Sequence, residues 1–361
     1  MRLRRVAVVL IALAALVLAA RAAPAQTDPT AGLTLSQLIG QRMIYSYEGT
    51  RPPAALIRRI GRGEAAGIIL FADNVGSRAG LRATLRRLQA VPRPRGLGAP
   101  LLVMIDQEGG QVKRLRGAPT YSPAQLGRIG SAALAHSQGR ATAANLRGVG
   151  VNVDLAPVVD VGRPGSFQQV TQRSYSSNPA VAARMAAAFV RGLQEGGVAA
   201  TLKHFPGLGT VSRNEDDVAQ RVSLPLATLR RIDETPFAAG IAAGAKLVMT
   251  STAIYPALAT RPAMLSAPVS TGELRGHLGF TGVSITDDVT VRGLARFGNP
   301  ASLGLAATRA GNDLLLYAGG YGSASASADA LVRTARAGRL DLGALRASAA
   351  RVLALRAGLA G

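Results

Sequence analysis

Charged residues follow three apolar runs of the sequence and could together carry out chemistry. Asp287 and Asp288 come directly after one run, Asp106 ends a second, and Lys203 and His204 end a third. Apolar, β-branched runs of this length predict buried strands, whose ends lie at the rim of a sheet or barrel. A carboxylate there attacks an electrophilic carbon or accepts a proton, while the cations donate hydrogen bonds to a hydroxylated ligand.

Structural roles are an alternative for each of these residues taken singly. Asp106 is also the kind of residue that caps a helix or forms an ion pair in a core, and Asp288 the kind that supports its neighbour. Because three separate runs end in ionisable residues, we favour one shared polar site.

Strand-like runs alternate with amphipathic helical patterns from about residue 40 onward. The expected strands span residues 41–46, 66–72, 100–106, 151–156, 198–203, 246–251, 282–287 and 312–317. The expected helices span residues 79–91, 124–147, 179–196, 226–243, 267–278, 301–310 and 325–356. This alternation predicts a single-domain (β/α)₈ TIM-type barrel, with a doubly wound open sheet as the alternative. In a barrel, the charged residues at the ends of the strands share one face.

The first residues have the pattern of a secretory signal peptide. A basic start precedes the apolar run 6–20, and Ala23-Pro24-Ala25 forms a small-x-small cleavage site. We therefore expect residues 1–25 to be a signal peptide and residues 26–361 to form the barrel domain. A retained anchor is the alternative, but the apolar run is short for a bilayer span. Membrane contact is expected only during export.

Arginine gives the chain a strong positive charge. The formal charge of +22 falls to +18 once the signal peptide is removed with its four arginines, and only three lysines are present. The arginines are scattered and aromatic residues make up only 4% of the chain, so we expect no nucleic-acid partner. An anionic cell wall or membrane surface is the expected counter-charge of this secreted protein.

Cofactor and metal sites are not expected from the composition. The chain has no cysteine and three histidines, which argues against a dedicated transition-metal site. Gly207-Leu208-Gly209 lacks the rest of a dinucleotide or phosphate-binding pattern. The reaction inferred below requires no cofactor.

Five stretches of sequence together resemble glycoside hydrolase family 3, and most closely its single-domain bacterial β-N-acetylhexosaminidases. They are residues 106–110 (Asp-Gln-Glu-Gly-Gly) with Arg114, residues 152–161, residues 173–175 (Arg-Ser-Tyr), residues 203–207 (Lys-His-Phe-Pro-Gly) and residues 286–288 (Thr-Asp-Asp). The resemblance extends from about residue 33 to residue 320. It implies a (β/α)₈-type barrel that hydrolyses β-linked N-acetylglucosamine with retention.

The resemblance also assigns roles to individual residues. Asp287 matches the nucleophile of the family, and a retaining glycosidase needs an ionised carboxylate there. We expect nearby cations to keep Asp287 ionised near neutral pH. The residues that match the sugar-binding positions are Asp106, Arg114, Arg173, Lys203 and His204.

The sequence departs from the family in the loop after Lys-His-Phe-Pro-Gly. Single-domain relatives carry an Asp-Ser-His run there, whose histidine is the general acid/base, but this chain has Asn214-Glu215-Asp216, and Leu208 stands where a basic residue is common. We expect His136 and His277 to have surface or packing roles. Asp216, or else Glu215, is then the candidate acid/base, provided that burial raises its pKa. A solvated or helix-capping acidic loop is the alternative.

The sequence thus predicts a secreted hydrolase of terminal β-N-acetylhexosaminides or related β-glycosides, such as cell-wall fragments. Asp287 and Asp216 are its expected catalytic pair. The alternative is an exported carbohydrate-binding protein that keeps the sugar site but has lost catalysis through the altered loop. A basic wall-associated scaffold is a third possibility, but it explains none of the converging motifs.

Overall fold

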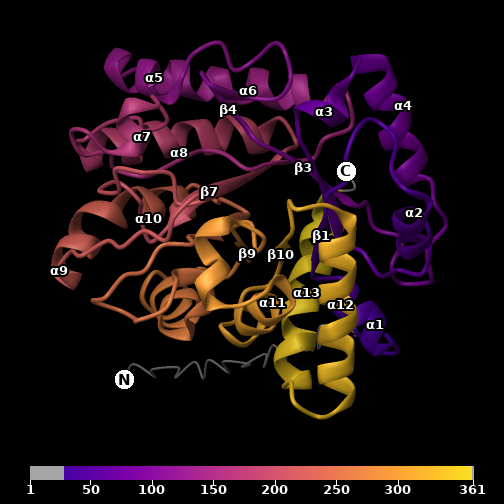
Figure 1. Ribbon diagram of the computed structural model, residues 1–361. Coiled ribbons are helices and arrows are strands. Elements are labelled where there is room, and N and C mark those ends of the chain that lie inside the picture. The colour runs from indigo at the N-terminus through magenta and orange to yellow at the C-terminus, as the bar shows by residue number, and fades with distance from the viewer. Residues whose placement is uncertain (1–27, 360–361) are drawn as a thin grey trace, which may run out of the picture.

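The computed structural model of the protein describes residues 28–359 (Figure 1). The expected signal peptide at residues 1–25 lies outside these residues. In the described range, no helix combines the length and the apolar character that a membrane span requires.

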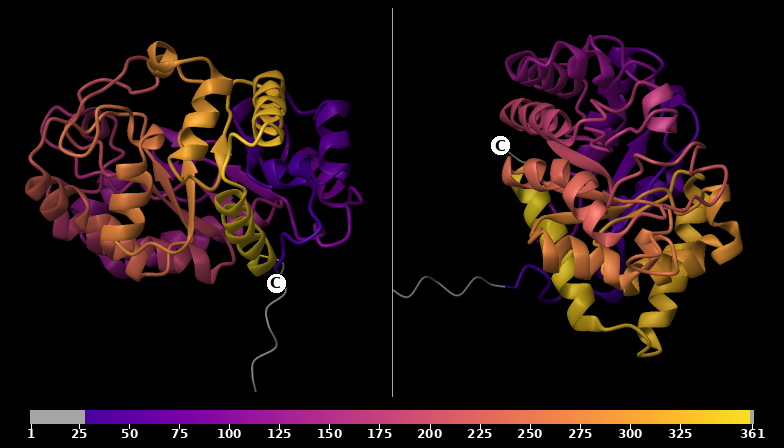
Figure 2. Two further views of the ribbon diagram at one scale, coloured as in Figure 1. Left: turned by 90° about the horizontal axis from the view of Figure 1, so that it is seen from below. Right: turned by 90° about the vertical axis from the view of Figure 1, so that its left-hand side faces the viewer.

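Eight parallel strands form the centre of the molecule, surrounded by helices (Figures 1 and 2). They are β1 Met43–Tyr45, β2 Gly67–Leu70, β3 Leu102–Ile105, β6 Val153–Asp154, β7 Ala199–Phe205, β8 Leu247–Thr250, β9 Val283–Thr286 and β10 Leu315–Leu316. From β1 to β9, strands adjacent in this order pair with each other, and β10 pairs with β1. A bridge between Ile285 of β9 and Leu314, beside β10, joins the two ends of the sheet. The closed barrel confirms the predicted (β/α)₈ fold and rules out the open sheet.

The first half of the chain contributes α1 Leu35–Gly40, α2 Ala54–Gly61, α3 Ala72–Val75, α4 Arg78–Gln89, α5 Pro123–Ile129, α6 Ala132–Arg147, α7 Phe167–Val170 and α8 Pro179–Glu195. The second half contributes α9 Leu226–Thr228, the π-helix η1 Leu229–Asp233, α10 Thr235–Ala242, the short 3₁₀ helix η2 Ala263–Leu265, the π-helix η3 Pro268–His277, the 3₁₀ helix η4 Arg292–Phe297, α11 Pro300–Arg309, α12 Tyr321–Arg336 and α13 Leu342–Gly358. A small hairpin of β4 Gln107–Gly109 and β5 Val112–Lys113 follows β3.

Two long predicted helices are each broken into two. Gly130 ends α5 in the left-handed conformation, and the side chain of Ser131 accepts a hydrogen bond from the first turn of α6. Between α12 and α13, Gly338 has a positive φ of 68°, and Asp341 caps the start of α13. The apolar pattern continues across both breaks, so the predictions of single helices at 124–147 and 325–356 were wrong.

The interior of the barrel is an apolar core of its own. Leu102 and Met104 of β3 belong to this inner cluster, whereas Val103 and Ile105 pack with the helices outside. This alternation is the ordinary period of a strand. All eight strands contribute to the inner cluster, and Val352 of α13 joins it.

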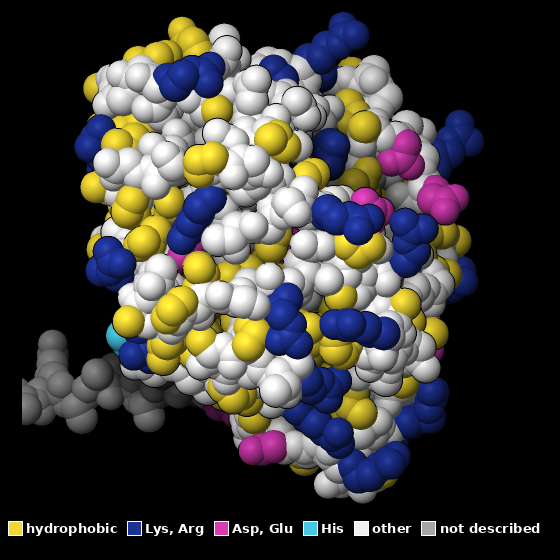
Figure 3. Space-filling model, turned by 60° about the vertical axis from the view of Figure 1, so that its left-hand side comes forward, with side chains coloured by type: hydrophobic (Ala, Val, Ile, Leu, Met, Phe, Trp, Pro, Cys, Tyr) yellow, Lys and Arg dark blue, Asp and Glu magenta, His cyan; other side chains and the backbone are white. Residues whose placement is uncertain are grey.

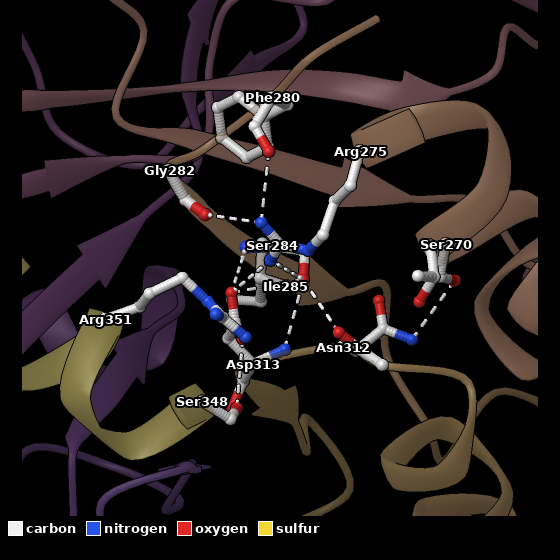
Figure 4. Close-up of polar contacts among 12 residues, drawn as sticks. Ser270, Arg275, Phe280, Gly282, Ser284, Ile285, Asn312, Asp313, Ser348 and Arg351 are labelled. Atoms are coloured by element: carbon white, nitrogen blue, oxygen red, sulfur yellow. Dashed lines mark hydrogen bonds and ion pairs between the residues drawn. The ribbon is translucent and has the colours of Figure 1, made fainter. Parts of the chain in front are cut away.

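Asp313 holds together the seam where the barrel closes (Figure 4). Its buried carboxylate accepts hydrogen bonds from Arg275 Nη2 at 2.5 Å and from Arg351 Nη2 at 2.8 Å. Ser284 of β9 donates its backbone N–H at 2.9 Å, and Ser348 of α13 donates its hydroxyl at 3.0 Å. One carboxylate thus ties η3, β9 and α13 to the segment leading into β10.

We expect Asp313→Asn to lower the free energy of unfolding by about 3–5 kcal/mol, because it leaves two guanidinium groups without their counter-charge at the seam. Urea denaturation monitored by circular dichroism measures the change. Asp329→Asn is the control, since Asp329 also pairs with an arginine (Arg59, 2.6 Å) but is half exposed. The control should change the free energy by less than about 1 kcal/mol. Equal changes in the two variants would contradict the prediction.

Candidate active site

A pocket of about 460 Å³ collects the charged residues that follow the strands. Its apolar lining includes Ile69, Leu155, Met249 and Leu316, which belong to the inner core of the barrel. All seven site residues predicted from the sequence line this pocket: Asp106, Arg114, Arg173, Lys203, His204, Asp216 and Asp287. Residues far apart in the sequence meet there because the strands are parallel and end on one face.

Glu108, in the hairpin after β3, organises the cations of the pocket. Its buried carboxylate lies 2.8 Å from Lys203 Nζ and accepts two hydrogen bonds from Arg173, each of 2.8 Å. Lys203 Nζ also donates to Asp106 Oδ1 at 2.6 Å. Burial opposes ionisation of Glu108, but the charges of Arg173 and Lys203 outweigh it and hold the pKa of Glu108 well below its usual range. The cations are therefore held in place before any ligand arrives.

His204 is buried and oriented by Asp160. Its Nδ1 lies 2.8 Å from Asp160 Oδ2, while Asp160 Oδ1 accepts hydrogen bonds from the backbone N–H groups of His204 and Leu208. Since Nδ1 is engaged, Nε2 is the free ring nitrogen, and it lies 4.0 Å from Glu215 Oε1. The ring is fixed with one nitrogen available to the pocket.

Glu215 and Asp287 form a close pair of carboxyl groups. One oxygen of Glu215, one oxygen of Asp287 and a ring nitrogen of His204 all lie within 4.8 Å of one another. Burial raises the pKa of Glu215 well above its ordinary value, and the negative charge of Asp287 adds to this effect. Burial in the confined pocket also raises the pKa of Asp287, although His204 and Lys203 oppose this shift. His204 and Lys203 favour the ionised form of Asp287, as the sequence analysis expected, but desolvation is the larger influence on its pKa. Because the two acids are close together, protonation of Glu215 favours ionisation of Asp287.

Asp216 lies next to Glu215 but at the exposed rim of the pocket. Its backbone N–H donates to Asn214 Oδ1 at 3.3 Å, and partial desolvation raises its pKa. The loop packs closely on η4, where a side chain at Gly293 would collide with the backbone oxygen of Glu215. Gly293 thus allows the loop to place Glu215 inside the pocket and Asp216 at its edge.

The remaining polar residues differ in whether their side-chain atoms already form hydrogen bonds within the protein. Among the described residues, the buried Nε of Arg114 has no hydrogen-bond partner, so it is available to a ligand. Asp288 Oδ1 accepts from the backbone and hydroxyl of Thr290 and from the backbone of Ala318, which agrees with a supporting role. His136 and His277 do not line the pocket.

Glu108 and Asp160 are site residues that the sequence analysis did not single out. Both belong to the stretches that carry the family resemblance: Glu108 precedes two glycines close to the apolar run 101–105, and Asp160 stands among valines. A buried acid in such a setting needs a charged or hydrogen-bonding partner. That signal could have identified both residues, although not their partners.

The barrel is closed and parallel, and the pocket at its strand ends holds a close pair of carboxyl groups and a fixed set of cations. This fold and this site are typical of the (β/α)₈-barrel hydrolases. Residues 35–355 match the family described as "Glycosyl hydrolase family 3 N terminal domain". The chain belongs to this family, and it is a glycosidase similar to β-N-acetylhexosaminidases.

Relatives of known sequence cover most of the chain. An "Uncharacterized secreted glycosyl hydrolase" of Arthroderma benhamiae is 37% identical over 92% of this chain and 96% of its own length. A "Beta-hexosaminidase" of Xanthomonas oryzae pv. oryzae is 39% identical over 70% of this chain and 75% of its own length.

Solved structures have the same fold. A family 3 β-N-acetylglucosaminidase of Paenibacillus sp. superposes with a TM-score of 0.86 at 34% identity, over 91% of this chain. This chain spans 64% of the length of that protein. A β-N-acetylhexosaminidase of Beutenbergia cavernae superposes with a TM-score of 0.82 at 31% identity, over 90% of this chain and 98% of its own.

Proposed function

We propose that the protein is a secreted glycosidase that removes terminal β-linked N-acetylhexosamine, or a related β-linked sugar, with retention of configuration. The separation of Glu215 and Asp287 carries this proposal. Carboxyl groups about 5–5.5 Å apart are typical of retaining glycosidases, whereas inverting enzymes keep them about 6.5–9.5 Å apart. One oxygen of Glu215 lies within 4.8 Å of one oxygen of Asp287, and this close approach favours the retaining class over the inverting one. The names of the relatives support the N-acetylhexosamine substrate.

In this mechanism, Asp287 attacks the anomeric carbon as the bond to the leaving oxygen breaks, and a protonated acid gives its proton to that oxygen. Water then attacks the covalent glycosyl-enzyme, the same acid group accepts a proton from it, and Asp287 is released. The sugar hydroxyls would be bound by Asp106, Arg114, Arg173, Lys203 and His204.

Glu215 fits the acid/base role better than Asp216, which the sequence analysis preferred. Glu215 is buried, its pKa is strongly raised, and it lies beside both His204 and Asp287. An acid held neutral near pH 7 can protonate a leaving group, while its partner acts as the nucleophile. Asp216 remains the alternative for this role.

Secretion and contact with the cell wall are also proposed. The Arthroderma benhamiae relative is named as secreted, and residues 1–25 have the signal-peptide pattern. Lys and Arg side chains outnumber Asp and Glu on the face shown in Figure 3. Such a surface favours anionic polymers of a cell wall, and wall fragments would then be near the site.

Turnover of aryl β-N-acetylglucosaminide and aryl β-glucoside by the mature chain tests the proposal. Hydrolysis of the first substrate, with the β-anomer as the initial product in NMR spectra, is the expected result. An initial α-anomer would contradict retention. Binding of N-acetylglucosamine without turnover of either glycoside would instead support the carbohydrate-binding alternative.

A further inference from the structure

A second cluster of ionisable side chains lies away from the pocket, between η1 and η3. Glu234 directly follows η1, whereas Glu273 and His277 lie four residues apart on η3. One oxygen of each glutamate and a ring nitrogen of His277 all lie within 4.8 Å of one another. None of the three residues lines the pocket described above.

Glu234 is the unusual member of this cluster. The residue is 1% exposed, and neither carboxylate oxygen has a hydrogen-bond donor among residues 28–359. A buried carboxylate without a partner is costly, so it must hold either a proton or a cation.

We propose that Glu234, Glu273 and His277 bind a divalent transition-metal ion, for which Zn²⁺ is the reference. Imidazole and carboxylate ligands suit zinc, and three protein ligands leave a fourth position for water. Ligand atoms around tetrahedral zinc lie roughly 3.3 Å apart, given its bond lengths. His277 Nε2 lies 3.9 Å from Glu273 Oε1, and the Glu234 oxygen lies within 4.8 Å of both ligand atoms, so the three side chains must move closer together to bind the ion. The His277 side chain is 41% exposed and opens a path for the ion.

Neither residue type nor spacing revealed this site in the sequence, because η1 and η3 meet only in the fold. The sequence analysis expected no dedicated transition-metal site and gave His277 a surface role. The burial of Glu234 is the observation that changes this interpretation.

Arg230 competes with an ion for Glu273. Its Nε and Nη2 donate to the two oxygens of Glu273 at 2.6 and 2.9 Å. The Arg230 side chain is 40% exposed and can turn outward when an ion binds. Removing this cation should strengthen metal binding, since like charges repel. Arg230→Gln is therefore expected to bind zinc several-fold more tightly than the wild type.

Calorimetric titration of the chelator-treated full chain with ZnCl₂ tests the site. Glu234→Gln and His277→Asn should each weaken zinc binding by more than about 10-fold, the lower end of the effect of losing even an indirect partner. His136→Asn is the matched control, because His136 lies 2.8 Å from one glutamate, Glu195, without a third ligand. Asp287→Asn removes one candidate ligand from the other cluster, which His204, Glu215 and Asp287 form in the pocket. This variant therefore distinguishes zinc binding in the pocket from zinc binding between η1 and η3. Both of these variants should keep the wild-type affinity for the η1–η3 site.

Three results would overturn the proposal: no zinc binding by the wild type, unchanged binding in both Glu234→Gln and His277→Asn, or loss of all binding in Asp287→Asn alone. In each case Glu234 would be a neutral acid that shares its proton with Glu273. His277→Asn keeps the test valid if Glu234→Gln does not fold, because His277 is exposed and its replacement leaves the buried residues in place.

Discussion

Asp287→Asn is expected to reduce kcat on aryl β-N-acetylglucosaminide by about 10⁴-fold or more, the scale of losing a nucleophile. The amide has nearly the shape of the carboxylate but cannot form the covalent intermediate. Asp287 directly follows β9, and its backbone N–H donates to the carbonyl oxygen of Thr250. The replacement changes neither the strand nor this hydrogen bond, so it should leave the barrel intact. Initial rates at saturating substrate measure the effect.

Binding of N-acetylglucosamine is the control for Asp287→Asn. The cations and acids that would hold the sugar hydroxyls remain in place, so the variant should bind the sugar with an affinity close to that of the wild type. A rate within 10-fold of the wild type would show that Asp287 is not the nucleophile.

Glu215→Gln is expected to lower kcat by about 10²- to 10⁴-fold on substrates with a basic leaving group, which is the usual range for general acid/base catalysis. The loss should be much smaller on a dinitrophenyl glycoside, whose leaving oxygen needs little protonation. Asp216→Asn and Asp217→Asn change neighbouring acids of the same loop, and Asp217 is exposed. Rates of the three variants on both substrates distinguish their roles.

A larger loss in Asp216→Asn than in Glu215→Gln would assign the acid/base role to Asp216. Equal sensitivity to both leaving groups would show that neither acid donates the proton. Asp217→Asn should stay near the wild-type rate in every case.

The pH dependence of the reaction gives a separate test of Glu215. The protonated form of Glu215 is the reactive one in the first step, and its pKa is raised. The rate should therefore be maintained at pH values well above the ordinary pKa of a glutamate. It should fall as the pH rises through the raised pKa of Glu215. Glu215→Gln cannot titrate, so this fall should be absent from its pH profile.

Much of the fold could be predicted because buried strands have a strong local signal. The run 101–105 is apolar throughout since β3 packs against the barrel core on one side and helices on the other. The convergence of Asp106, Lys203 and Asp287 then follows from the parallel order of the strands alone. These residues could be grouped without any knowledge of their contacts.

The finer arrangement of the site depends on tertiary contacts that have no local signal. Glu215 and Asp216 are adjacent acids, and only the packing of their loop against Gly293 decides which one is buried. Likewise, the orientation of His204 depends on Asp160, which comes from a different strand-to-helix segment. The helix breaks at Gly130 and Gly338 are decided by single left-handed residues within continuous apolar patterns.

Ser348, Arg351 and Val352 belong to α13, the last helix of the described chain, yet they complete the seam at Asp313 and the core inside the barrel. A ribosome supplies residues in order, so the seam and the inner core are complete only after α13 has emerged. A nascent chain would lack these contacts until α13 had been synthesised. If residues 1–25 direct export as predicted, this delay favours passage of an incompletely folded chain through a narrow translocation channel.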